Sequence, residues 1–312
     1  MQTNTEHRFA AGIVRGMLLL GWIAAAAGCG GQSAQRPDPD FNPPIGEATF
    51  PEGRGPVVSI DEAHHNFHTA AGRYSPFARL LRRDGYRVLE SKEALSAGSL
   101  KEIQILVISN ALAERNAKGD WTLPTPSAFT AAEATALREW VEAGASLLLI
   151  ADHMPFPGAV SNLAQEFGIT FSNGFAVRKG VKDGRLFFRR EDGGLRDNKI
   201  TLGISTVVSF TGSAFRAIDA DPLLVLGANV ESLEPDQAWR FEEKTPRVPV
   251  AGWCQGAVML RDKGRVAVFG EAALFSAQLD GVLRSPMGMN QPAAAENPRF
   301  LLNVMRWLAG VE

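Results

Sequence analysis

Short apolar runs alternate along the chain with longer stretches that carry apolar residues at helical spacing. The runs lack the polar alternation of a half-exposed strand, so they predict strands that are buried on both faces. They are Val57–Ile60, Tyr86–Leu89, Ile103–Ile108 and Ser146–Ile150. The helical stretches open with a capping pattern and stop at a glycine. They cover 75–85, 130–144 and 297–310. This alternation predicts an α/β fold with a mostly parallel sheet that is covered on both faces.

The pattern becomes less regular in the second half of the chain. Residues 174–201 are dense in Gly, Arg, Lys and Asp, which predicts a hairpin or an irregular insertion. Residues 257–268 predict a second hairpin that turns at 262–264. Three further apolar runs predict strands at 207–210, 223–226 and 248–253.

The N-terminus has the pattern of an export signal. The uncharged run Gly16–Gly28 is too short to span a bilayer, which needs about 20 apolar residues. It ends in small residues directly before Cys29, as in the lipobox of bacterial lipoproteins. We therefore predict a lipoprotein signal peptide over 1–28 and lipidation of Cys29, with an ordinary signal peptide and an incidental cysteine as the alternative.

The segment after Cys29 contains many proline and glycine residues and predicts a flexible tether over 29–55. A single domain is then expected over 56–312. On this interpretation the protein is exported and is a membrane-anchored lipoprotein of the bacterial cell envelope.

Charge and cysteine content exclude several classes of protein. The 32 Lys and Arg are offset by 34 Asp and Glu, so no basic face for nucleic acid is expected. Two cysteines exclude a disulfide framework and a cysteine-rich zinc module. Cys254 lies in a sequence that imitates a nucleophile elbow, Gly-Trp-Cys-Gln-Gly, but the residues after it predict a strand instead of the required helix. We therefore expect Cys254 to be structural.

Polar residues that can do chemistry follow the predicted strands. Four of the five histidines lie directly after two of these strands, and carboxylates and an amide accompany them. Because ligands bind at the carboxyl ends of parallel strands, these residues predict one polar site. The candidate acid/base residues are Asp61, His64, His153 and Glu271. The candidate ligand-binding residues are His65, Asn66, His68, Asn110 and Asp152.

A divalent metal is one candidate cofactor for this site. His64, His68, Asp152 and His153 are its candidate ligands, although their spacing matches no standard metal motif. If the segment after the first strand forms a helical turn, Asp61, His64 and His68 share one face. The alternative is structural: an aspartate at a strand end caps a turn, and a histidine fills a hydrogen-bonded space.

Several segments together resemble the class I glutamine amidotransferase-like superfamily. They are Val57–His64, Trp140–Ala145, Leu195–Gly203, Gly264–Glu271 and Asn297–Gly310. The resemblance is to the non-amidotransferase branches, which include trehalose-utilisation-like proteins and uncharacterised domains of bacterial lipoproteins. It implies a flavodoxin-like, doubly wound sheet for most of 56–312. Asn198 and Lys199 replace the His and Pro of a family segment, and the amidotransferase triad is missing, so glutamine hydrolysis is not implied.

Two classes of function remain open from the sequence. The first is a hydrolase, with or without a metal, that acts on carbohydrate or cell-envelope material. The density of titratable groups at the strand ends favours it. The second is a non-catalytic module of the cell envelope that binds a polar small molecule, a carbohydrate or a partner. The absence of a recognised nucleophile or metal motif favours this second class.

Overall fold

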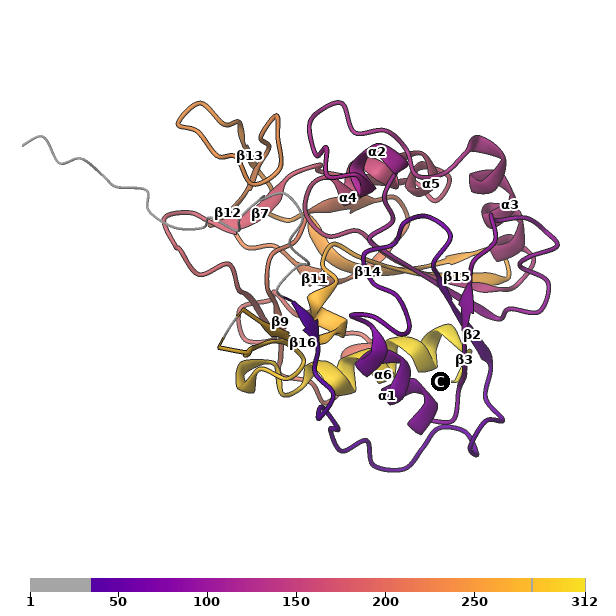
Figure 1. Cartoon of the computed structure of the whole chain (residues 1–312). Coiled ribbons are helices and arrows are strands. Elements are labelled where there is room, and N and C mark those ends of the chain that lie inside the picture. Colours follow the sequence, from indigo (N-terminus) through magenta and orange to yellow (C-terminus); the bar gives the residue numbers. More distant parts are fainter. Residues whose placement is uncertain (1–34, 282, 312) are drawn as a thin grey trace, which may run out of the picture. The chain divides into compact units, whose positions relative to one another are not determined.

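The computed structural model describes residues 35–281 and 283–311. A nine-stranded mixed sheet is the main element of this part of the chain (Figure 1). Its strands are β2 (Val57–Asp61), β3 (Arg87–Ser91), β4 (Ile105–Ser109), β5 (Ser146–Ile150), β6 (Ile169–Phe171), β10 (Phe215–Ala217), β11 (Asp221–Val225), β14 (Cys254–Arg261) and β15 (Gly264–Phe269). Five neighbours are parallel, in the order β3-β2-β4-β5-β15. The sheet then continues antiparallel through β14, β10, β11 and β6. The predicted α/β class, the four strands and the hairpin at 257–268 are confirmed, but β3 lies at the edge of the sheet with Leu89 exposed and is not buried on both faces.

Helices lie against both faces of the parallel strands. They are α1 (Ser75–Arg83), α2 (Glu114–Ala117), α3 (Ala131–Glu142), α4 (Phe156–Ala159), α5 (Ser161–Gln165) and α6 (Asn297–Leu308), with 3-10 turns at η1 (Lys199–Thr201), η2 (Ala273–Phe275) and η3 (Pro292–Ala294). Successive side chains of a strand point to opposite faces. On β5, Leu148 and Ile150 therefore join the apolar cluster of α1 and α6, whereas Leu147 and Leu149 join that of α3 and α5.

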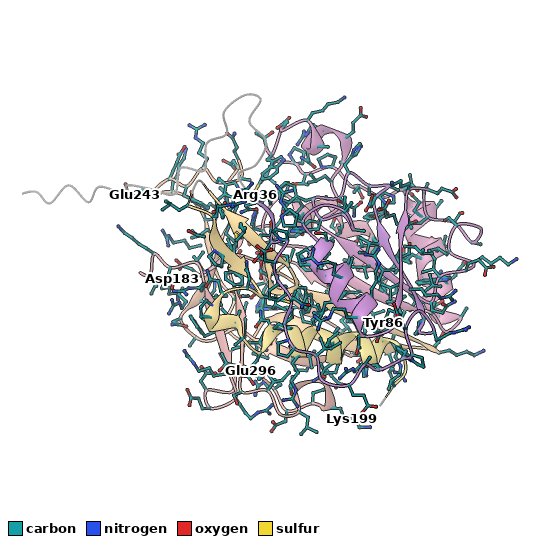
Figure 2. The ribbon with its side chains drawn as sticks, turned by 60° about the horizontal axis from the view of Figure 1, so that its bottom comes forward. Arg36, Tyr86, Asp183, Lys199, Glu243 and Glu296 are labelled. Atoms are coloured by element: carbon teal, nitrogen blue, oxygen red, sulfur yellow. The ribbon has the colours of Figure 1, made fainter. Side chains whose placement is uncertain are left out.

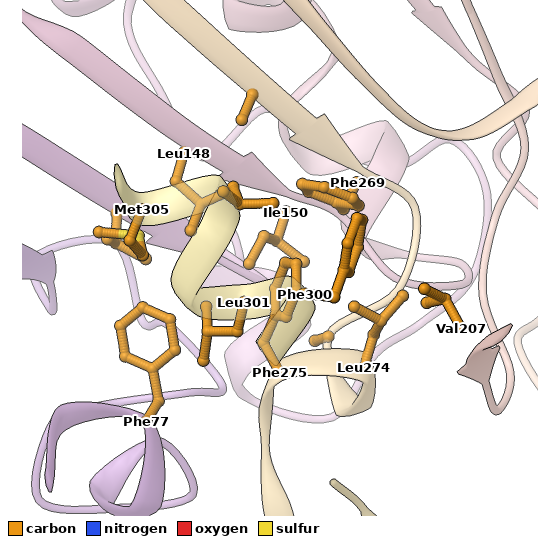
Figure 3. Close-up of a cluster of buried hydrophobic side chains, with 14 of the residues drawn as sticks. Phe77, Leu148, Ile150, Val207, Phe269, Leu274, Phe275, Phe300, Leu301 and Met305 are labelled. Atoms are coloured by element: carbon orange, nitrogen blue, oxygen red, sulfur yellow. The ribbon is translucent and has the colours of Figure 1, made fainter. Parts of the chain in front are cut away.

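The last helix, α6, packs on the sheet through buried apolar side chains. Phe300, Leu301 and Met305 of α6 are fully buried against Ile150 and Phe269 of the sheet (Figure 3). Burying one such side chain stabilises the fold by about 1.5–3 kcal/mol. Within the described part of the chain, none of the helices combines the length and the apolar character needed to cross a bilayer.

The helix boundaries follow the sequence closely. Thr130 and Glu133 form the predicted capping box at the start of α3, with each side chain accepting the backbone N–H of the other residue. The α1 helix has its proline in the first turn and stops before Gly85. Gly85 adopts φ +94°, and a Cβ there would lie 2.2 Å from the carbonyl oxygen of Phe50. Only glycine fits this close approach.

Residues 174–201 do not fold as the predicted hairpin. Their strands are β7 (Phe175–Arg178) and β8 (Leu186–Arg189), which pair with β12 (Val230–Leu233) and β9 (Thr206–Ser209). β12 also pairs with β13 (Arg247–Pro249), which is the short strand found where 248–253 was predicted. β7 and β8 separate because the linker between them is polar, while each strand buries apolar side chains in a different cluster.

The segment expected to be a flexible tether is packed onto the domain over its described part. We call residues 36–55 the N-terminal strap. Its first strand, β1 (Arg36–Pro37), pairs with β16 (Ala277–Asp280), which also pairs with β17 (Ser285–Gly288). The Arg79 guanidinium donates to the carbonyls of Asp38 and Pro39, at 2.9 and 3.3 Å. Thr49 donates to the Asp84 carboxylate through its N–H and its hydroxyl.

The strap stays in place because its prolines still offer carbonyl acceptors, although they lack N–H donors. Phe41, Ile45 and Phe50 also pack against the core. Glu296, which Figure 2 labels, also joins two segments that are distant in the chain, because its carboxylate accepts the backbone N–H of Thr206 at 2.9 Å. The predicted signal peptide and Cys29 lie outside the described residues.

Candidate functional site

Asn110 connects the loops that follow three neighbouring parallel strands. Its backbone carbonyl accepts the N–H of Phe67, and its own N–H donates to Ile150. Its side-chain oxygen accepts the N–H of Asp152 at 2.9 Å. Asn110 adopts φ +52°, a conformation that asparagine tolerates better than most residues. The residues after β2, β4 and β5 are thereby held at one edge of the sheet.

His64 is fixed between two carboxylates. Its Nδ1 lies 2.9 Å from Asp61 Oδ2, and its Nε2 lies 2.9 Å from Glu133 Oε1. Its ring packs on Phe129 with centroids 4.1 Å apart. Burial opposes protonation, but the hydrogen bonds and charges of the two carboxylates outweigh it and raise the pKa of His64. Both ring nitrogens are thus engaged within the protein.

The loop after β2 is irregular and forms no helical turn, so the condition under which Asp61, His64 and His68 would share one face is not met. His65 adopts φ +46° and is exposed. The Asn66 side chain donates to Asp61 and accepts the backbone N–H of His64. These bonds favour an Asx-type turn over a helix, because the side chains satisfy the backbone locally. Asp61 and His64 therefore point toward α3, and His68 lies elsewhere.

Glu133 belongs to this arrangement and was not among the candidate site residues. Its second oxygen accepts the backbone N–H and the hydroxyl of Thr130, while its first binds His64. Burial raises the pKa of Glu133, but these hydrogen bonds reverse the effect and lower it to about 2. The sequence predicted the capping box, but it did not predict that His64 binds the same glutamate.

His68 is buried beside Tyr74, with ring centroids 4.6 Å apart. Its Nδ1 has no hydrogen-bond partner among the described residues. Burial, together with the charges of Arg73 and His153, lowers the pKa of His68 well below its usual value. His68 is therefore neutral at physiological pH. Its neighbour Phe67 lies 5.6 Å from Phe156, which in turn contacts His153.

Asp152 and Glu271 form a buried pair of carboxyl groups at the ends of β5 and β15. Asp152 accepts the N–H of His153 at 2.7 Å. Glu271 accepts the N–H groups of Ala273 and Leu274, both at 2.7 Å, and so caps η2. Burial and the nearby Asp152 raise the pKa of Glu271 well above its usual value, and burial also raises the pKa of Asp152.

His153 lies in a corner of aromatic rings, which we call the aromatic corner. Its ring stacks on Phe175 at 4.7 Å and meets the edge of Trp239 at 4.5 Å. Its Nδ1–H donates to the carbonyl of Met154 at 2.8 Å. Phe241 extends the corner from Phe175 and is 39% exposed. Trp239 adopts φ +67°, which is unusual for so bulky a residue.

The structure thus divides the predicted site into two parts. Asp61, His64 and Asn66 join Glu133 in an internal network, whereas His68, Asp152, His153 and Glu271 lie toward the aromatic corner. Within residues 35–281 and 283–311, no three His, Cys, Asp or Glu side chains are arranged so that they could hold one metal ion. Cys254 begins β14, and burial raises the pKa of its thiol to about 11.

Comparisons with known proteins bear on the fold. No protein-family model matches the chain, and no curated protein matches it either. The mmIFT52 N-terminal domain is 17% identical, with a TM-score of 0.57, and the match covers 81% of this chain and 97% of that one. A protein described as ThuA-like from Bacteroides uniformis is 14% identical over 82% and 92% of the two chains, with a TM-score of 0.49. The first likeness shows a shared fold.

Proposed function

We propose that this chain is an exported, lipid-anchored protein of the bacterial cell envelope whose domain binds a carbohydrate-like ligand at the aromatic corner. We further propose that the domain is a flavodoxin-like, doubly wound member of the non-amidotransferase, trehalose-utilisation-like branch of the class I amidotransferase-like superfamily. Two observations support this assignment. The parallel strands have the order second-first-third-fourth-fifth, which is the flavodoxin-like order, and helices pack on both faces.

The observation that carries the binding function is that the protein already engages most of the candidate acid/base groups of the site, although His68 Nδ1 has no partner among the described residues. Both nitrogens of His64, the Nδ1 of His153 and both oxygens of Glu271 form internal hydrogen bonds. General acid/base catalysis needs a group that is free to exchange a proton with substrate. Groups that are fixed in this way are better suited to shaping a rigid binding surface.

The aromatic corner supplies the contacts that a sugar needs. Ligand sites are lined mostly by apolar and aromatic side chains, with a few polar groups that fix orientation. Trp239 is half-buried and Phe241 is exposed, so their rings can contact the apolar side of a sugar, whereas Asp152 and His153 are buried. The left-handed conformation of Trp239 costs about 1–3 kcal/mol, and such strain gathers at ligand contacts.

A second candidate function is a hydrolase that uses Asp152 and Glu271. Two carboxyl groups whose pKa values are shifted by burial and by each other are the usual acid and base of glycoside hydrolysis.

Titration with oligosaccharides separates the two candidates. Maltotriose, cellotriose and triacetylchitotriose are added to the purified domain while heat and tryptophan fluorescence are recorded. Binding of at least one of them should weaken at least tenfold in Trp239→Ala, and should stay unchanged in the control Trp307→Phe on α6. Saturable binding without release of shorter sugars supports the binding module. Sugar release that Glu271→Gln abolishes supports the hydrolase, and no binding of any sugar contradicts both.

Lipid anchoring is tested independently of the ligand. In a bacterial host fed with labelled palmitate, the wild-type chain should carry the label and Cys29→Ala should not. Equal labelling of the two chains would refute the anchor.

A further inference from the structure

A second cavity lies apart from the strand-end site, among β7, β8, β11 and β12. Its volume is about 560 Å³, within the range of small-molecule sites. None of the residues that line it belongs to the candidate site described above. Three arginines line it, namely Arg178 at the end of β7, Arg189 at the end of β8, and Arg196 in the loop that follows.

The charge in this cavity is unbalanced. The one acidic residue in its lining is Asp192, and its Oδ1 already accepts the N–H of Gly194 at 2.9 Å. Arg189 has a carboxylate neighbour, Glu191, but the two groups are 3.9 Å apart and both are exposed. Such an exposed pair neutralises little of the charge. The cavity therefore presents a positive potential.

Arg178 carries a donor that the described protein leaves unused. Its Nε is buried and has no hydrogen-bond partner among residues 35–281 and 283–311. A buried donor without an acceptor is costly, and a guanidinium is well suited to grip a carboxylate or a phosphate with two parallel hydrogen bonds. Both features favour an anion at this position.

One wall of the cavity is apolar. Phe187 lines it, and the Arg189 guanidinium lies 4.9 Å from the centre of that ring. Arg185 lies 5.7 Å from the centre of the same ring and is paired with Asp183, which Figure 2 labels. Phe187 is thus held in place by two cations. Its ring offers a surface for the uncharged body of a ligand.

We infer that this cavity binds a small organic anion, whose carboxylate or phosphate group is held by Arg178 and Arg196 while its body packs on Phe187. The cavity requires no ligand at the aromatic corner, so this inference stands apart from the proposed function. Sugar acids and sugar phosphates have the required chemistry.

Matched probes test the inference and identify the anionic group. Glucuronate, glucose 6-phosphate, inorganic phosphate and neutral glucose are titrated into the purified domain by calorimetry at low and high salt. One of the two charged sugars should bind, more weakly at high salt, and glucose should not. The preferred charged sugar tells carboxylate from phosphate, and tighter binding than inorganic phosphate shows that the sugar body contributes.

Variants locate the site. Arg178→Gln and Arg196→Gln should each weaken binding of the charged sugar about tenfold or more, whereas Arg240→Gln, an exposed arginine outside the cavity, should leave it unchanged. Arg196 is exposed, so its variant keeps the test valid if Arg178→Gln fails to fold. The inference is overturned if neither charged sugar binds, or if binding is the same in Arg196→Gln as in the wild type.

Discussion

Nε2 of His64 lies 2.9 Å from Oε1 of Glu133, although 69 positions separate the two residues in the chain. This contact joins the loop after β2 to the first turn of α3. Because Glu133 also caps that helix, one carboxylate fixes the helix start and the histidine together. The hydrogen bonds among Asp61, His64 and Glu133 thus hold the loop after β2 against the start of α3.

Glu133→Gln should destabilise the domain markedly. The substitution removes the charge that balances the His64 cation, and breaking such a buried pair costs about 3 kcal/mol. Urea unfolding measures the loss. Glu139→Gln, on the exposed side of the same helix, is the control and should cost less than about 0.5 kcal/mol. Equal stability of the two variants would show that the pair contributes nothing.

Stability should depend on pH through the same residues. The pKa of His64 is raised, so its contribution is complete below about pH 6.5, the usual histidine value, and is lost as the pH rises through the folded-state pKa. The pKa of Glu133 is lowered to about 2, so its contribution is complete above the usual glutamate value of about 4.3 and is lost as the pH falls toward 2.

The difference in unfolding free energy between wild type and His64→Gln should therefore be greatest between these limits. Urea unfolding in steps from acid to alkaline pH measures it. A difference that does not change with pH would mean that His64 stays neutral in the folded protein.

Glu271 should keep its proton to a higher pH than an exposed glutamate does. Its raised pKa stabilises the folded state at low pH, and that contribution is lost as the pH rises through the folded-state value. The carbonyl stretch of its protonated carboxyl group should persist in the infrared spectrum above the usual glutamate pKa of about 4.3 and should be missing in Glu271→Gln. In Asp152→Asn, where the neighbouring charge is gone, the band should vanish at a lower pH than in the wild type. A spectrum without this band would contradict the assignment.

Replacement of Asn110 should separate backbone strain from hydrogen bonding. Asn110→Ala loses the acceptor for Asp152 and puts an unsuitable residue at φ +52°, whereas Asn110→Gly loses only the acceptor. We expect alanine to be less stable than glycine by about 1 kcal/mol, which is the cost of the left-handed conformation. Thermal unfolding of the two variants gives the difference, and a glycine variant no more stable than the alanine one would disprove the strain.

The sequence predicted most of the parallel sheet, because buried strands and capped helices carry local signals. Ser146–Ile150 coincides with β5, and the capping box of Thr130 opens α3 as expected. The pairing of β7 with β12 could not be predicted, because short strands in polar surroundings do not specify their distant partners.

For the candidate site, the sequence predicted only that its residues follow the ends of parallel strands. The ring contacts connect His68 and His153 only indirectly, because Phe67 contacts His68, Phe156 contacts His153, and these two phenylalanines pack on each other. The direction of His64 was not predictable, because it depends on a glutamate of a helix that approaches from elsewhere in the chain. The aromatic corner was missed for the same reason: Trp239 and Phe241 come from an irregular segment with no periodic pattern.

The N-terminal strap has a consequence for proteolysis. A free proline-rich linker is an easy target for proteases, and one cut would release the domain from whatever precedes it. A cut inside the strap leaves two pieces that stay together, since β1 remains paired with β16 and Arg79 still binds the carbonyls of Asp38 and Pro39. These contacts therefore oppose separation of the two pieces after a cut, and they use backbone carbonyls, which proline retains.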